Sequence, residues 1–173
     1  MKVVLHIAVS INGYMARPDG NEDFISLENW QHFCALSKEY NNLIVGIKTY
    51  EAVEAWGPEY SFDNLGIDQK MILSHDKTYP IKDGYTLVSS PHEGIFILQE
   101  KKFETVLLSG GSHVNSAFIR GNLIDEIIMN VEPVVVGTGI PLFVPYDFEQ
   151  RLELISSTQL EKGILSLKYR VLK

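Results

Sequence analysis

The stretch from Lys102 to Phe143 constrains the fold most, because it holds two glycine loops that each follow an apolar run. Residues 106–108 are continuously apolar, which is typical of a strand covered on both faces. This run stops at Ser109-Gly110-Gly111-Ser112, where residues without a Cβ let the backbone turn sharply and approach a ligand. We expect Ser112 to cap a helix that ends with Gly121 in the position after its last turn.

A helix that starts at an open glycine loop offers unpaired N–H groups and the positive end of its dipole, and both suit a phosphate. An ordinary strand-to-helix turn explains a bare Gly-Gly pair about equally well, because the motif is short. The glycine loop is therefore a candidate phosphate site that needs support from elsewhere in the chain.

Composition narrows the class of protein. With 173 residues, 45% hydrophobic and 21% charged, the chain suits one domain over residues 1–173. Fifteen Lys plus Arg face 22 Asp plus Glu, a net charge of −7, and no basic run occurs, so we expect no nucleic-acid partner. The lone Cys34 sits among apolar residues and is expected to pack in a reducing cytosol, which predicts a cytoplasmic protein. The apolar start carries His6 and is read as a buried strand, so no membrane partner is expected.

Apolar runs and turn residues alternate along the whole chain. They predict strands at 2–9, 43–45, 71–73, 85–89, 105–108 and 124–131, with a terminal hairpin of 152–158 and 164–171. Helices are expected to begin near Ser26, Ile47, Pro91 and Ser112, and 59–69 is expected to be a polar loop dotted with aromatic residues. The fold class is therefore α/β, with a mostly parallel central sheet flanked by helices and an antiparallel C-terminal hairpin.

Two kinds of loop interrupt this pattern. Residues 14–25 carry four turn signals directly after the first strand, and such a long loop is either a lid or a mobile surface excursion. Three predicted strands end in similar polar groups, at 46–49, 74–75 and 110–113. Because ligands bind outside the carboxyl ends of parallel strands, we expect these segments to converge on a dinucleotide.

Four motifs in this order resemble the dihydrofolate reductase superfamily, and more narrowly the reductase domain of the bifunctional riboflavin-biosynthesis deaminase/reductase and its stand-alone relatives. They are Ser10-Ile11-Asn12-Gly13, Gly46-Ile47-Lys48-Thr49-Tyr50-Glu51, Leu108-Ser109-Gly110-Gly111-Ser112, and Asp125-Glu126 followed by 132–143. The resemblance implies a dihydrofolate-reductase-like fold, NADPH as cofactor, a glycine pair that carries the pyrophosphate and often has a cis bond, and a homodimer.

The resemblance also implies site residues. The cofactor would be bound by Ala8, Gly46, Lys48, Thr49, Ser74, Gly110, Gly111, Ser112 and His113. Ser10 and Asn12 would contact the substrate. Two positions depart from the family pattern. Ile47 stands where a basic residue commonly holds the extra phosphate of NADPH, so that Lys48, Ser74 or His75 would have to replace it. Asn12 stands where the riboflavin-type reductases have Asp.

Reduction also requires a proton donor. Four carboxyls lie in or beside the first long loop, those of Asp19, Glu22, Asp23 and Glu28, and we take Asp23 and Glu28 as the candidate catalytic residues. The five histidines show no metal-ligand spacing. The first hypothesis is an NAD(P)H-dependent reductase that acts on a small pyrimidine- or pterin-like substrate. The alternatives are a dihydrofolate reductase and a nucleotide-binding module without catalysis.

Overall fold

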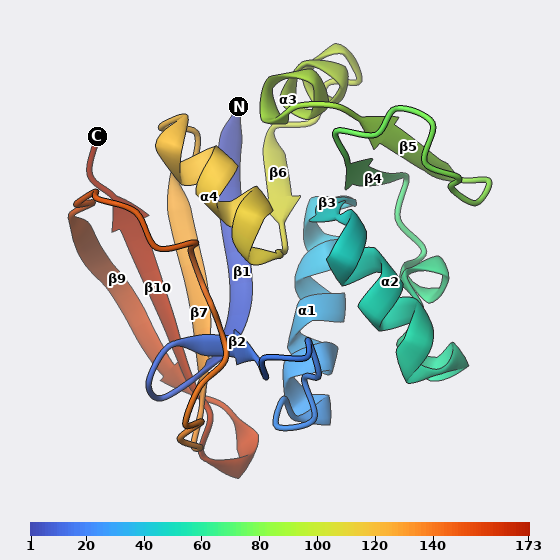
Figure 1. Ribbon diagram of the computed structural model, residues 1–173. Helices are drawn as coiled ribbons and strands as arrows, with labels where there is room; N and C mark the ends of the chain where they lie inside the picture. The colour runs from blue at the N-terminus through green and yellow to red at the C-terminus, as the bar shows by residue number, and fades with distance from the viewer.

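The computed structural model describes all residues, 1–173, and is organised around one eight-stranded sheet (Figure 1). Its strand order is β5 (Tyr85–Val88), β4 (Gln69–Leu73), β3 (Asn42–Gly46), β6 (Thr105–Leu108), β1 (Lys2–Ser10), β7 (Glu126–Glu132), β10 (Leu165–Val171) and β9 (Leu152–Gln159). The first six are mutually parallel, whereas β10 is antiparallel to both β7 and β9. The predicted fold class is confirmed.

Four helices cover the two faces of this sheet: α1 (Leu27–Tyr40), α2 (Ile47–Trp56), α3 (Pro91–Glu100) and α4 (Ser112–Arg120). Side chains of β1 alternate between the faces, as in any strand. Val3 and Leu5 pack with α3 and α4, whereas Val4 packs with α1 and α2. Because the central strands are buried on both faces, they read as apolar runs in the sequence. None of the helices has the length and apolar character needed to span a bilayer.

Three local expectations were wrong. The N-cap of α4 is Gly111, whose extended backbone starts the helix, so Ser112 is already its first helical residue and makes no capping bond. The left-handed residue after α4 is Asn122, with φ 54°, and not Gly121. Residues 59–69 are not simply a polar loop: the 3-10 helices η1 (Pro58–Tyr60) and η2 (Phe62–Leu65) lie there, with Phe62 and Leu65 fully buried. Their aromatic and apolar side chains outweigh the polar composition.

The second glycine loop docks on the loop after β1. The short strand β2 (Tyr14–Ala16) pairs antiparallel with β8 (Ile140–Pro141) in a separate two-stranded sheet. The side chain of Asn12 adds two hydrogen bonds to Val136, donating to its carbonyl at 2.6 Å and accepting from its N–H at 3.1 Å. The structure therefore joins the predicted lid to the second glycine loop.

Candidate functional site

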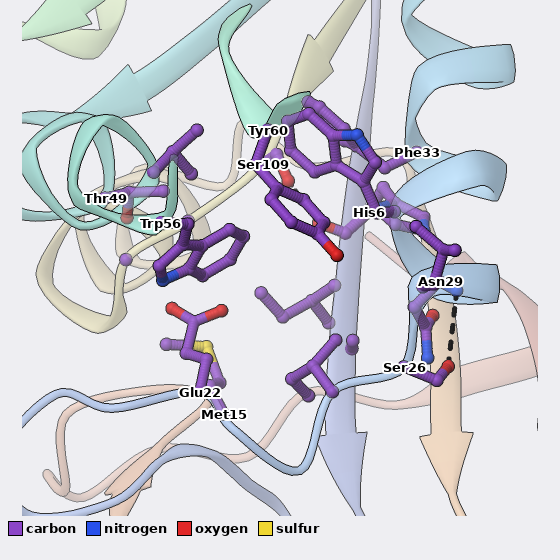
Figure 2. A pocket seen from close by; sticks show the side chains of 18 of the residues that line it. His6, Met15, Glu22, Ser26, Asn29, Phe33, Thr49, Trp56, Tyr60 and Ser109 are labelled. Atoms are coloured by element: carbon purple, nitrogen blue, oxygen red, sulfur yellow. Dashed lines mark hydrogen bonds between the residues drawn. The ribbon is translucent and has the colours of Figure 1, made fainter. Parts of the chain in front are cut away.

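A cavity of about 260 Å³ opens between the first glycine loop, α1, α2 and residues 14–25 (Figure 2). The middle of β1 contributes His6, Ile7 and Ala8 to its wall. Much of the remaining wall is aromatic, made by Trp30, Phe33, Trp56, Tyr60 and Phe62. Trp30 is the centre of this group, since its ring lies 5.2 to 6.2 Å, centroid to centroid, from the other four. Aromatic rings held in this way offer flat apolar surfaces to a planar ligand.

One side of the cavity is formed by glycines that leave no room for side chains. The Gly46 N–H donates to the Gly110 carbonyl at 3.0 Å, and Gly110 has φ 84°, a left-handed conformation that favours glycine. A Cβ added to Gly111 would lie 3.2 Å from Thr49 Oγ1, and one added to Gly46 would lie 2.7 Å from Val114 Cγ2. The peptide bond between Gly110 and Gly111 is cis.

This glycine cradle fits a phosphate group. It stands at the N-terminus of α4, where the first-turn N–H groups have no partners within the helix and the dipole is positive. The hydroxyl of Ser112 is buried there and has no hydrogen-bond partner. Backbone donors, a dipole and an unpartnered hydroxyl together form the donor set that an anionic oxygen requires. The residues present therefore fit the pyrophosphate of a dinucleotide.

The predicted cofactor residues fall into two groups. Ala8, Thr49, Gly110 and Gly111 line the cavity. The others lie outside its lining: Gly46 and Ser112 are buried beside the cradle, Lys48 and His113 are exposed in the first turns of α2 and α4, and Ser74 is buried at the end of β4. The Ser74 hydroxyl is occupied by the backbone of Asp76, to whose carbonyl it donates at 3.0 Å.

The two predicted substrate contacts do not line the cavity. The Ser10 hydroxyl, fully buried, donates to Asn12 Oδ1 at 2.9 Å and accepts from the Tyr14 N–H at 3.1 Å. Asn12 in turn holds Val136, as described above. The hydrogen bonds of both side chains are therefore made within the turn after β1 and across to the second glycine loop.

The structure separates the candidate acids. Glu22 is half-buried, and Figure 2 shows its carboxyl pointing into the cavity near Trp56 and Met15. Burial raises the pKa of Glu22 from 4.5 to about 7. Asp23 also reaches the cavity wall, but its carboxyl is exposed and accepts a hydrogen bond from Arg17 Nε at 2.6 Å.

Glu28 is not brought to the cavity. Its carboxyl forms an ion pair with Lys162 at 2.6 Å, and that bond lowers the pKa of Glu28 below its usual value. The next residue, Asn29, lines the cavity in its place, together with Phe33 one helical turn further on. One residue rotates the side chain by about 100° around a helix, which is enough to move it to another face.

A buried relay of polar side chains lies behind the aromatic wall. The Glu132 carboxylate accepts hydrogen bonds from the N–H and the hydroxyl of Ser26, both at 2.7 Å, and from Asn29 Nδ2. Asn29 Oδ1 then accepts from Asn130 Nδ2 at 2.6 Å, and Asn130 Nδ2 also faces His6 Nε2 at 3.3 Å. Because a carboxylate only accepts hydrogen bonds, the relay orients both amides.

The imidazole of His6 is neutral because it is buried. Asn130 Nδ2 carries two hydrogens, and Asn29 Oδ1 at 2.6 Å and His32 Nδ1 at 2.8 Å lie closer to it than His6 Nε2 does. Burial, and then the neighbouring His32, lower the pKa of His6 to about 3. The sequence did not predict this relay, and it did not assign Asn29 to either face of the helix that begins near Ser26. The spacing of four between Asn29 and Phe33 is the local signal that could have found it.

The parallel sheet, the cradle at the start of α4 and the loop of residues 14–25 that lines the cavity define a dihydrofolate-reductase-like protein. The chain matches the RibD C-terminal domain family over residues 1–166 and belongs to that family. It is 27% identical to the uncharacterized protein YwjB of Bacillus subtilis, over 94% of each chain, and 20% identical to YyaP of the same organism.

Solved structures agree on the fold. A putative riboflavin biosynthesis protein from a Shewanella species superposes with a TM-score of 0.82 at 22% identity, over the full length of both chains. RibD of Acinetobacter baumannii superposes with a TM-score of 0.79 at 18% identity. This chain covers 58% of that larger protein. At these identities the similarity establishes the architecture.

Proposed function

We propose that the chain is an NADPH-dependent reductase of the riboflavin-pathway type, which reduces a small pyrimidine- or pterin-like ring. The observation that carries the proposal is the meeting of two features at one cavity: a glycine cradle suited to phosphates and an aromatic wall with the Glu22 carboxyl inside it. Membership of the RibD C-terminal domain family and the riboflavin-related names of its structural neighbours support it.

The chain's own residues would hold the cofactor at the cradle. Backbone N–H groups at the start of α4 and the Ser112 hydroxyl would bind the pyrophosphate, with Thr49 beside them. Lys48, exposed in the first turn of α2, and His113, exposed in that of α4, would supply charge for the remaining phosphate. When bound, NADPH supplies the hydride. The aromatic wall and the lid would exclude water from the reacting atoms.

Glu22 would supply the proton. A carboxyl with a pKa of about 7 is still substantially protonated at neutral pH, which suits a general acid. Asp23 and Glu28 are weaker candidates, because Asp23 is exposed and paired with Arg17, and the hydrogen bond from Lys162 lowers the pKa of Glu28. We therefore assign proton donation to Glu22 in preference to the two acids expected from the sequence.

The test has two stages. Titration of NADPH and NADH against the fluorescence of Trp30 and Trp56 measures cofactor binding before any substrate is known. Loss of NADPH absorbance is then followed over a panel of pyrimidines and pterins. We expect micromolar binding and turnover on at least one ring. Turnover on dihydrofolate alone would favour a folate reductase, and tight binding without turnover on any ring would favour a nucleotide-binding module.

A further inference from the structure

The cavity lacks the positive charge that a phosphorylated substrate would require. None of the residues that line it is a Lys or an Arg. Its ionisable side chains are His6, which stays neutral, Tyr60 and the two carboxyls of Glu22 and Asp23. A phosphate in this cavity would therefore meet acidic groups and no cation, apart from the cradle already assigned to the cofactor.

Two positive groups next to the cavity, Arg17 and Lys162, are already paired. Arg17 bonds to Asp23 at 2.6 Å, and Lys162 bonds to Glu28 at 2.6 Å. Lys48 adjoins the lining residue Thr49, but its exposed side chain is outside the lining and is assigned to the cofactor.

The N-terminus of α1 also faces the cavity, since Ser26, Leu27 and Asn29 all line it. A helix of 14 residues would normally offer an anion site at that end. Here the Glu132 carboxylate takes the Ser26 N–H, and the Ser26 hydroxyl caps the Asn29 N–H. The chain's own carboxylate thus occupies the positive end of this helix.

We propose that the cavity binds a planar heteroaromatic substrate that carries no phosphate group. The inference rests on the proposed reductase function, whose substrate class it narrows. Burying a phosphate without a cation costs several kcal/mol, because the lost hydration is not replaced. An uncharged ring avoids this cost and gains the flat contact with the aromatic wall.

Glu22 supplies the polar contact for such a ring. Its carboxyl has no ion pair and no hydrogen bond within the protein, and it faces the cavity from the lid. A protonated carboxyl both donates and accepts one hydrogen bond, which matches the adjacent nitrogen and carbonyl groups of pyrimidine and pterin rings. Burial favours the protonated form.

The test uses a matched pair of ligands, a ribosylaminopyrimidine nucleoside and its monophosphate ester, which differ in the phosphate alone. Quenching of Trp30 and Trp56 emission measures the binding of each, with and without NADPH. We expect the nucleoside to bind about tenfold more tightly or better, equivalent to about 1.4 kcal/mol. Equal or tighter binding of the phosphate ester would overturn the inference.

A pair of variants tests the electrostatic cause. Asp23→Asn frees the Arg17 guanidinium beside the cavity, so the preference for the nucleoside should shrink several-fold. Adding Arg17→Gln to Asp23→Asn removes the freed charge and should restore the preference. If the preference is the same in all three proteins, the pairing of Arg17 does not set it and the electrostatic argument fails.

Failure of this inference is distinguishable from failure of the proposed function. If NADPH does not bind but the nucleoside still binds better than its ester, the proposed reductase function is wrong, and the inference that the cavity binds an unphosphorylated ring still holds. If NADPH binds and neither the nucleoside nor an unphosphorylated pterin does, the ligand class is wrong and the cofactor site stands.

Discussion

Replacing Gly139 by valine should separate lid closure from cofactor binding. Gly139 precedes β8 and lies directly against β2, so that an added Cβ would sit 2.3 Å from the Ala16 carbonyl oxygen and 3.0 Å from Tyr14 Cβ. Ordinary contacts begin at 3.4 Å, so β2 must move by about 1.1 Å. The nearby Gly137 is a matched control, because nothing lies within 4 Å of its added Cβ.

The displacement reaches the cavity through β2. Met15, at the centre of β2, lines the cavity, and Glu22 follows in the same loop. Misplacing catalytic groups by about 1 Å can lower turnover by about 100-fold. Overpacking of this kind also costs about 1–3 kcal/mol, which for a chain of this size lowers Tm by about 2–12 °C.

The assays are steady-state kinetics, NADPH titration and thermal unfolding of Gly139→Val and Gly137→Val side by side. We expect Gly139→Val to lower kcat far more than it raises the Kd for NADPH, because the glycine cradle is on another segment. Gly137→Val should resemble the parent in all three assays. Equal loss of turnover and of NADPH binding in Gly139→Val, or loss of binding alone, would show that the second glycine loop contacts the cofactor.

Three further predictions concern the cradle, the acid and the sheet edge. Gly111→Val should raise the Kd for NADPH about tenfold or more with an unchanged circular dichroism spectrum, since its side chain would crowd Thr49 Oγ1 and fill the cradle. Because the pKa of Glu22 is raised, this residue's contribution to the free energy of unfolding falls as pH rises from 4.5 to about 7, and urea unfolding should show the parent losing stability relative to Glu22→Gln over that range. All eight residues of β9 are exposed at the sheet edge, so we expect light scattering to report a homodimer at micromolar concentration and a monomer for Leu154→Lys.

Much of the fold could be predicted because the central strands are buried on both faces. Residues 43–45 of β3 and 106–108 of β6 are continuously apolar and are followed by a glycine or a polar turn, and this pattern depends on local sequence alone. The cradle could be predicted for the same reason, since only Ser109 separates the glycine pair from β6. Residues 134–136 show the limit of such patterns: they are as apolar as a strand, yet they lie in no strand, and Val136 is buried while Val135 is exposed.

The rest of the site depends on contacts between distant parts of the chain. Asn29 and Glu132 are 103 residues apart, and no local sequence pattern indicates that their side chains form a hydrogen bond. The aromatic wall likewise joins Trp30 on α1 to Trp56 on α2 and to Phe62 on η2. The structure places Glu22 at the cavity and Glu28 away from it, a difference that depends on helix phase and on burial, neither of which composition reports.

The two sides of the cavity are held in different ways, and this bears on how it works. The α1 wall is tied to β7 through Glu132 and Asn130, by bonds that join segments about a hundred residues apart. Residues 17–25 form hydrogen bonds only among themselves. The segment is therefore anchored over the cavity at its two ends, by β2 before it and by Ser26 and α1 after it. Glu22 belongs to this segment, so the burial of its carboxyl depends on where the segment lies. If the segment moved away from the cavity, that carboxyl would return to water, and its pKa would fall from about 7 back toward 4.5. Because the segment is held only at its ends, its position over a bound ligand would also set whether the Glu22 carboxyl keeps the proton that reduction consumes.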